Sequence, residues 1–584
     1  MKKVVYMLII GILCASIVLY FTQGIEKVSA DDVEILRVYN WEEYISEGDE
    51  DGEYADVISD FETYCQEVLG RNVIVEYSTF GTNENMYNEL NMSKKSVGGK
   101  TTYSYDLVCP SEYMIMKMIR EDMLETIDKS KLENYYNGAS GYLLERFENL
   151  TVDGKKVSDY AACYMWGTMG FVYNPEFVED IDAFDWSLCW NEDYKGTSTI
   201  KDSVRDSYVL AIGYVYQDEL LALSEQYSKG ELDAVTYNAK ITEIFDRTDS
   251  DTIELVKNAL LDLKDNIFGY EVDSGKKDMA QGKILINFAW SGDGVYTLDT
   301  AEGAYDDIPE DEILELSWAV PTAGSNIWFD GWVMPKGSNT ELSLEFINYL
   351  SRPDVAVSNM SYIGYTSAIA GDSLYENAVD WYGYAGDSFN LEQDGVEKVV
   401  SGNKATYTYF EDCDFETALS DGETEVYKNW YITEVEDGTT TYFVREQYFI
   451  LNEDTSEYEL DYDETFEVFE VDLSYFFDNL EEYDSASIFT DTLGRQFSAQ
   501  YPDFDTVTRC TIMKSFTDSE TKDLNDMWQT AKIGRISSAI IWSIIGVLAG
   551  IILVVITLTT LYKKGKIFQP KAPKGYTLKN IDLH

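Results

Sequence analysis

The sequence predicts an α/β protein that carries a β-rich insertion and ends in a transmembrane helix. Three observations support this fold class. Strand-like apolar runs alternate with amphipathic helical stretches, which is typical of βα units around a mainly parallel sheet. In residues 378–470, by contrast, acidic residues and tyrosines are concentrated in short alternating runs. Residues 536–562 are apolar or uncharged over 27 positions, long enough to cross a bilayer about 30 Å thick.

The first elements follow one another in the order strand, helix, strand, helix, strand. We expect strands at 33–38, 72–77 and 105–109, because each is a short run rich in β-branched or apolar residues. Residues 54–69 have apolar side chains at helical spacing, and residues 85–92 start another helical stretch. This alternation is the pattern of βα units.

The same pattern resumes in the middle of the chain. One helix face is marked by apolar residues at helical spacing, namely Ile253, Val256, Leu260 and Leu263. Residues 284–290 are predicted to form a strand and residues 342–350 a helix. Pro353 then suits the first turn of the next helix, where its missing N–H has no helical partner to lose.

The insertion at about 378–470 is predicted to be β-rich. Residues 427–435 and 439–449 flank Asp437-Gly438, a strong signal for a two-residue hairpin turn. Asp394-Gly395 suggests a second turn. The acidic run 461–467 lacks the ordered spacing of a calcium loop, so we interpret it as a solvated acidic surface.

Both ends of the chain indicate export and membrane attachment. Residues 1–30 have Lys2 and Lys3 first, then an apolar core and a small-residue site, the order of a signal peptide or an uncleaved N-terminal anchor. The lysine-rich segment 563–584 follows the predicted transmembrane helix 536–562, which places this tail in the cytoplasm. The body between these ends should therefore lie on the extracellular or periplasmic face.

Charge and composition exclude several functions. The net charge is -62, from 106 acidic and 44 basic side chains, so the body repels nucleic acid and attracts cations. The only histidine is His584, which leaves the body without a histidine for a catalytic triad or zinc site. The cysteines lack CxxC spacing, and we expect most of them to be buried thiols.

Aromatic rings stand beside polar or acidic residues at the ends of several predicted strands. The blocks are Tyr39-Asn40-Trp41-Glu42-Glu43-Tyr44, Pro110-Ser111-Glu112-Tyr113, Trp290-Ser291-Gly292-Asp293, Trp328-Phe329-Asp330 and Ile363-Gly364-Tyr365-Thr366. Ligands of open α/β sheets bind beyond the carboxyl ends of strands, so these blocks can converge on one cleft. Rings and carboxylates together suit a flexible aliphatic ammonium compound. Each block alone is more often structural.

Taken in order, the blocks resemble the spermidine/putrescine-binding proteins of polyamine ABC importers. The motifs are those of Tyr39–Tyr44, Tyr105–Tyr113, Tyr164–Thr168, Ser203–Asp206, Trp328–Asp330, Arg352–Ala356 and Ile363–Tyr365. The resemblance covers residues 35–374 and resumes over 472–532.

The resemblance implies a two-lobed periplasmic-binding-protein fold of type II that closes about a hinge. Lobe 1 would comprise 31–167 and 326–372, and lobe 2 would comprise 168–325 and 373–535, including the insertion. The implied function is extracellular capture of spermidine or putrescine and delivery to the permease of an ABC importer with its ATPase. It implies binding without enzymatic turnover, no cofactor, no metal and no nucleic acid partner.

The resemblance also implies the ligand-binding residues. They are Trp41, Glu42, Tyr44, Ser111, Tyr113, Ser203, Asp206, Trp290, Trp328, Asp330 and Tyr365. Asp330 is the strongest candidate for an ammonium partner, beside the central ring of Trp328.

Three positions depart from the family pattern. Glu42 stands where a small polar residue is frequent, and Ser203 stands where some members have aspartate, with Asp202 adjacent. Met513 occupies the region of a terminal glutamine contact. These departures leave the choice between spermidine and putrescine open.

Other classes of function remain open at this point. The chain has enough paired carboxylates and aromatic platforms for a glycosidase. It is also compatible with a surface adhesin or ion-buffering protein that works through the insertion. Within the binding class, another small cationic or uncharged solute is the main alternative.

Overall fold

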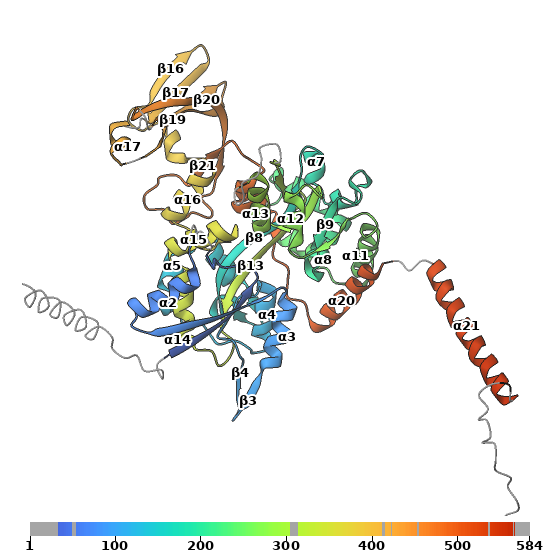
Figure 1. Ribbon diagram of the computed structural model, residues 1–584. Coiled ribbons are helices and arrows are strands. Elements are labelled where there is room, and N and C mark those ends of the chain that lie inside the picture. Colours follow the sequence, from blue (N-terminus) through green and yellow to red (C-terminus); the bar gives the residue numbers. More distant parts are fainter. Residues whose placement is uncertain are drawn as a thin grey trace, which may run out of the picture.

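The computed structural model describes residues 33–48, 54–303, 313–411, 415–421, 423–452, 455–534, 538–564 and 566. The predicted signal segment 1–30 and most of the tail 563–584 lie outside these residues. The described chain forms an α/β body, a second sheet beside it and a separate C-terminal helix (Figure 1).

An 11-stranded sheet forms the centre of the body, with the order β10-β9-β11-β8-β13-β5-β1-β2. β12 and β14 pair with β8, and β22 pairs with β13. Its strands are β1 (Val33–Trp41), β2 (Asn72–Phe80), β5 (Leu107–Val108), β8 (Ala161–Tyr173), β9 (Ser198–Lys201), β10 (Gly269–Glu271), β11 (Ile286–Trp290), β12 (Ser317–Ala319), β13 (Ser325–Val333), β14 (Thr366–Ser367) and β22 (Cys510–Thr511). Two short hairpins lie outside it, β3 (Lys95–Val97) with β4 (Lys100–Thr102) and β6 (Thr151–Val152) with β7 (Lys155–Lys156).

The expectation of a mainly parallel sheet is wrong at the centre of this sheet. β1 runs parallel to β2 and β5, and β9 runs parallel to β10 and β11, as the βα pattern predicts. β8 and β13 run antiparallel to each other, and β8 is also antiparallel to β11. Both strands are buried along their whole length, so they carry no polar-apolar alternation that would reveal their direction.

The register between β8 and β13 shifts between Asp330 and Gly331. Asp330 is paired with Met165 and Gly331 with Cys163, so Tyr164 is the extra residue on β8. A bulge of this kind bends the strand and changes the direction of nearby side chains. Because it lies next to Asp330, it helps to set the direction of that carboxylate.

Helices cover the body's sheet (Figure 1). Their bounds are α2 (Val57–Glu67), α3 (Asn83–Ser93), α4 (Glu112–Arg120), α5 (Glu133–Gly138), α6 (Gly141–Asn149), α7 (Asp180–Ala183), α8 (Val204–Val215), α9 (Gln217–Ser228), α10 (Ala234–Phe245), α11 (Ser250–Leu263), α12 (Ser274–Ala280), α13 (Ser291–Glu302), α14 (Thr340–Leu350), α15 (Pro353–Ile363), α16 (Asp372–Tyr382), α18 (Gln496–Gln500), α19 (Phe504–Thr508) and α20 (Asp518–Ile533). α15 begins at Pro353, which confirms that prediction.

Two hydrophobic clusters lie on either side of the middle of β8. The first cluster contains Trp166 and the preceding residues of β8, together with residues of β1, β2, α4 and α14. The second cluster takes Met169 and Phe171, together with residues of α8, α10 and α11. Residues of α16 and the segment 471–510 pack in the first cluster, whereas 513–531 packs in the second. The division into lobes at 167/168 and 372/373 stays a prediction.

The second sheet is antiparallel, with the order β15-β21-β20-β19-β18-β17-β16. Its strands are β15 (Tyr384–Ala385), β16 (Glu397–Ser401), β17 (Lys404–Glu411), β18 (Glu425–Glu436), β19 (Thr439–Asn452), β20 (Glu457–Asp472) and β21 (Ser487–Thr490), and α17 (Phe415–Asp421) lies between β17 and β18.

The hairpin predicted at Asp437-Gly438 joins β18 to β19. Asp437 and Gly438 both have positive φ, 51° and 86°, as a type I′ turn requires. The acidic run 461–467 lies within β20, so it is an extended strand and not a calcium loop.

The described cysteines are buried thiols, as the sequence suggested. Cys65, Cys109, Cys163, Cys189 and Cys510 are all buried and free of disulfides. Burial raises the pKa of the Cys65 thiol to about 11 and those of Cys189 and Cys510 to about 12 because it disfavours the thiolate.

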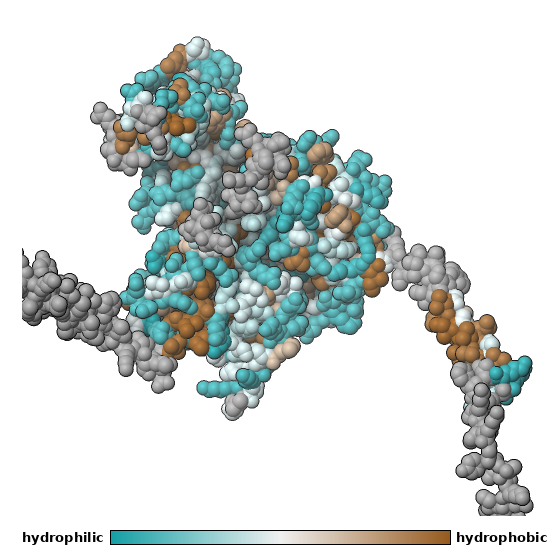
Figure 2. Space-filling model, viewed as in Figure 1, coloured by the Kyte–Doolittle hydropathy of each residue, from teal (hydrophilic) through white to brown (hydrophobic). Residues whose placement is uncertain are grey.

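α21 (Ser538–Lys563) is a long apolar helix that lies apart from the body. Its segment Ile545–Lys563 is apolar enough to cross a membrane, and none of that segment is buried in the protein. Figure 2 shows its exposed apolar surface, which contrasts with the largely hydrophilic surface of the body. α21 is therefore a candidate membrane span.

Candidate functional site: an aromatic and acidic cavity

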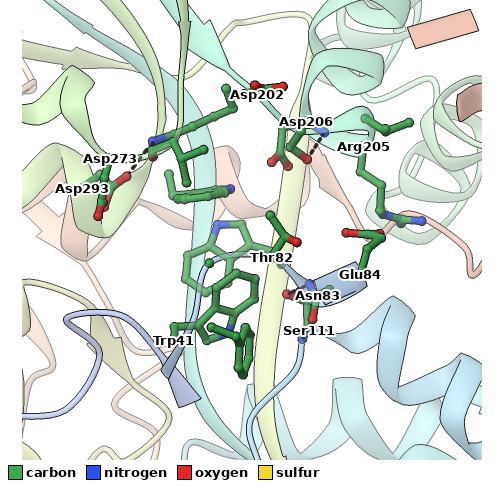
Figure 3. Close-up of a pocket in the computed structure, with 18 of the residues that line it drawn as sticks. Trp41, Thr82, Asn83, Glu84, Ser111, Asp202, Arg205, Asp206, Asp273 and Asp293 are labelled. Atoms are coloured by element: carbon green, nitrogen blue, oxygen red, sulfur yellow. Dashed lines mark hydrogen bonds and ion pairs between the residues drawn. The ribbon is translucent and has the colours of Figure 1, made fainter. Parts of the chain in front are cut away.

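A cavity of about 340 Å³ opens where strands of the central sheet end. All eleven residues predicted from the sequence line it: Trp41, Glu42, Tyr44, Ser111, Tyr113, Ser203, Asp206, Trp290, Trp328, Asp330 and Tyr365. They come from β1, β11 and β13 or the turns that follow these strands, from the N-terminal ends of α4 and α8, and, for Tyr365, from the turn between α15 and β14. The structure thus brings the separate sequence blocks together at one place (Figure 3). Whether they bind a ligand stays a prediction.

Aromatic rings form the frame of the cavity. Trp328 and Tyr365 meet edge to face with ring centroids 5.7 Å apart, and Tyr44 meets Tyr365 at 4.9 Å. Trp41 is held against Phe80 at 4.7 Å. Such edge-to-face contacts restrict the rings, so the cavity presents fixed aromatic surfaces.

Two glycines make room for these rings. A Cβ on Gly292 would lie 2.2 Å from the ring of Tyr365. A Cβ on Gly167 would lie 2.3 Å from Ser291 Oγ and 2.7 Å from the ring of Trp328. No side chain fits at such distances without displacing its neighbour, so glycine at both positions permits the observed packing.

Asp330 lies on β13 at the bulge and is 6% exposed. The Tyr44 hydroxyl donates to its Oδ2 at 2.8 Å, whereas its Oδ1 has no hydrogen-bond partner among the described residues. Burial raises the pKa of Asp330 to about 7 against the opposing effect of hydrogen bonding to Ser111 and Tyr44, and the negative charges of Glu112 and Asp206 add smaller contributions. Asp330 is therefore a buried carboxyl group with one oxygen available to a cation.

Glu112, in the first turn of α4, is a second buried carboxyl group that the sequence analysis did not choose. It accepts the backbone N–H of Phe329 at 3.1 Å, and burial raises its pKa to about 7 although the charge of Arg205 opposes this. The Arg205 guanidinium lies 3.8 Å from the centroid of the Tyr113 ring. It donates to the carbonyl of Lys514 at 3.1 Å.

Asp206 lies in the first turn of α8. Ser203 caps this helix, since its Oγ accepts the N–H of Asp206 at 3.4 Å. Burial raises the pKa of Asp206, and hydrogen bonding to Ser203 opposes the shift. Asp202, considered as a substitute for Ser203, is paired with Lys532 of α20 at 2.6 Å. Ser203 therefore caps α8 and also lines the cavity.

A different set of charges occupies the other end of the cavity. Lys201 is fully buried and pairs with Glu271 at 3.0 Å and with Asp293 at 2.8 Å. Tyr365 donates its hydroxyl to Asp293 Oδ1 at 2.7 Å. Burial opposes ionisation of Asp293, but the charges of Lys201 and of Lys276 outweigh it and lower the pKa. This end contains carboxylates that already have cationic partners.

The turn after β1 shows which of two adjacent glutamates contacts a charged group. Glu42, the predicted residue, is exposed at the rim. Its neighbour Glu43 pairs with Lys276 of α12 at 3.2 Å. Glu43, Lys201 and Lys276 were not among the predicted site residues. Their charged partners lie far away in the chain, so no local sequence pattern indicates these ion pairs.

Figure 3 shows the arrangement of these charges. Asp273 and Asp293 lie on one side of the aromatic rings, and Asp206, Arg205 and Glu84 lie on the other. Ser111, which bridges to Asp330 in the sheet, lies on the side of Asp206. The cavity can hold an aliphatic chain between rings and an ammonium group against carboxylates.

The chain is similar in sequence to known solute-binding proteins. Residues 62–378 match the family described as bacterial extracellular solute-binding protein. The spermidine/putrescine-binding periplasmic protein of Salmonella typhimurium is 25% identical over 397 residues, which cover 65% of this chain and 95% of that protein. The putrescine-binding periplasmic protein of Escherichia coli is 24% identical over 350 residues, which cover 58% and 79% respectively.

The chain is also similar to a solved structure. The substrate-binding protein of a spermidine/putrescine ABC transporter from Streptococcus pneumoniae is 20% identical, with a TM-score of 0.46. The match covers 86% of this chain and 99% of that chain.

Proposed function

Because this chain belongs to the family of bacterial extracellular solute-binding proteins, we propose that it captures a polyamine outside the cell and delivers it to the permease of an ABC importer. The family's role is solute binding, so the chemistry of the site is recognition and not turnover. The relatives that are named for spermidine or putrescine support a polyamine as the solute.

The observation that carries the proposal is the free oxygen of Asp330. Its carboxyl group is buried beside the ring of Trp328, and its Oδ1 has no partner among the described residues. A buried carboxylate oxygen without a partner is costly, and an ammonium group offsets this cost through a charge-assisted hydrogen bond. The aromatic faces around it favour cationic and aliphatic groups.

We propose that two lobes close on the ligand, with lobe 1 formed by 31–167 and 326–372 and lobe 2 by 168–325 and 373–535. Two contacts join these parts across the cavity. Arg205 stacks on Tyr113, and Lys276 pairs with Glu43. A ligand that touches both parts favours the closed state through differential affinity.

The C-terminal helix is proposed to anchor the protein in the cell membrane. α21 is long and apolar enough to span it, and Lys563, Lys564 and Lys566 follow on one side, which favours a cytoplasmic tail. This arrangement would hold the binding body beside the permease and its ATPase on the outer face of the membrane.

Calorimetric titration of the full chain in detergent micelles tests the proposal. We expect binding of putrescine, spermidine or spermine. 1,4-Butanediol, which has the carbon chain without ammonium groups, and glutarate, which has the opposite charge, should not bind. The Asp330→Asn variant should bind polyamines at least about 30-fold more weakly. Equal binding of the diol, or no binding of any polyamine, would overturn the proposal.

A further inference from the structure

The charged groups of the cavity fall into two sets that differ in whether the protein already neutralises them. In the first set, Glu271 and Asp293 are buried and pair with Lys201, while Lys276 pairs with Asp293 and with the more exposed Glu43. In the second set, Asp330, Asp206 and Glu112 make no ion pair among the described residues. Asp293 of the first set and Asp206 of the second lie on opposite sides of the aromatic rings (Figure 3).

The side chain of Lys201 supplies one buried ammonium group to the first set. Its side chain is 1% exposed, and its Nζ donates to the carbonyl of Val272 at 2.9 Å and to Asp293 at 2.8 Å, with Glu271 at 3.0 Å. Val272 and Asp293 thus accept two of the three ammonium protons, and Glu271 adds an ion pair. The same Nζ lies 4.3 Å from the centroid of the Trp290 ring. A cation–π position on Trp290 is therefore already taken.

Lys276 places a second ammonium group there, nearer the mouth of the cavity. Its Nζ lies 3.2 Å from Glu43, 3.1 Å from Asp273 and 3.7 Å from Asp293. It also lies 5.0 Å from the centroid of the Tyr296 ring. This lysine thus has carboxylate and aromatic neighbours of the kind that an ammonium group of a ligand would need.

The buried charges of the first set are balanced, since two carboxylates face two ammonium groups. Glu43 and Asp273, the remaining carboxylates there, are largely solvated, with side chains 66% and 47% exposed. The second set differs, because none of its three carboxyl groups is ion-paired among the described residues. The charge of Arg205 acts on Glu112 and Asp206, and that of Lys201 also acts on Asp206. A ligand's ammonium groups are therefore attracted to the second set and repelled by the lysines of the first.

From this arrangement we infer that Lys201 and Lys276 act as resident ammonium groups that make the cavity selective for a short diamine over a triamine. The inference rests on the proposed function. A diamine places its ammonium groups near Asp330, Asp206 and Glu112 with its methylenes between the rings. The third ammonium of a longer polyamine would have to displace Lys276 or lie beside it. Lys276 is thus a specificity-determining residue.

Titration of the full chain with putrescine and spermidine tests the inference. We expect the wild-type protein to bind putrescine at least tenfold more tightly than spermidine. Lys276→Gln should reduce this ratio at least tenfold, mainly by strengthening spermidine binding, because it frees the carboxylates that a third ammonium needs. Lys276→Arg keeps the positive charge and should keep the preference for putrescine.

Lys277→Gln is the matched control, because it removes the same charge from the exposed side of the same helix. It should leave the ratio unchanged. Thermal melting establishes that each variant is folded, and the wild-type ratio tests the inference without any variant. Tighter binding of spermidine by the wild type, or an unchanged ratio in Lys276→Gln, would overturn the inference and leave the proposed function intact. No binding of either compound would overturn both.

Discussion

Replacing Asp330 by asparagine should weaken ligand binding and stabilise the unliganded protein at the same time. The substitution keeps the shape of the side chain and an oxygen that accepts the hydrogen bond from Tyr44, now 2.8 Å from Oδ2. It removes the charge, which no described cation neutralises directly. A purely structural residue would not show opposite effects on these two quantities.

The magnitudes follow from the burial of Asp330. Loss of a carboxylate that is paired with a desolvated ammonium costs about 2–5 kcal/mol of binding free energy. In the unliganded protein, the pKa rises from 3.8 to about 7. Since this folded-state value lies above the unfolded one, the stability contributed by the protonated group is complete below about pH 4 and is lost as the pH rises through 7. At pH 8 the ionised group then costs about 4 kcal/mol.

Asparagine avoids this cost but must find an acceptor for its amide N–H groups, at about 1–3 kcal/mol if one is missing. We therefore expect a net gain in stability of about 1–3 kcal/mol at pH 8. Thermal melting without ligand measures this gain, and calorimetry with putrescine measures the loss of affinity. The reasoning would be refuted if Asp330→Asn lowered the melting temperature at pH 8, or if it left the affinity unchanged.

Three further predictions concern the same cavity. Putrescine affinity of the wild type should rise at least about tenfold between pH 6 and pH 8, because ionisation of Asp330, with a pKa of about 7, changes from roughly a tenth to nine tenths, and Glu112, with a pKa of about 7, adds to the effect. Calorimetry at both pH values measures this, and a flat profile contradicts it. Trp328→Ala should weaken binding by about 1–3 kcal/mol through loss of ring contact with the ligand, and an affinity equal to that of the wild type would remove this residue from the site. Lys201→Met should destabilise the fold by about 3–5 kcal/mol, because it leaves two buried carboxylates without their cationic partner. Thermal melting checks this, with Lys277→Met as the control for loss of an exposed charge.

Much of the fold could be predicted because its signals are local. The turn at Asp437-Gly438 and the start of α15 at Pro353 follow from backbone preferences of single residues. The direction of β8 could not be predicted, because every residue of this strand is buried and its pairing is decided by partners more than 100 residues away. The bulge that positions Asp330 is a property of that pairing and has no local signal either.

The candidate site was predictable only in part, for a related reason. Asp330 and Trp328 stand in a short block of unusual composition, and the structure places both in the cavity. Lys201 and Lys276 acquire their environment from Glu271, Asp293 and Glu43, and only folding brings these groups together. The choice between Glu42 and Glu43 likewise depends on the path of the turn after β1.

The buried thiols offer a way to observe how the two halves of the protein open. Cys109 and Cys163 lie in the first hydrophobic cluster and Cys189 in the second, and burial holds their thiols in the unreactive protonated form. Once Cys14 and Cys413 are replaced by serine, the labelling rate of each remaining thiol reports exposure of its own cluster. Separate rates for Cys163 and Cys189 would show that one half unfolds independently of the other. A single shared rate would show that the strands crossing between them bind both halves into one cooperative unit.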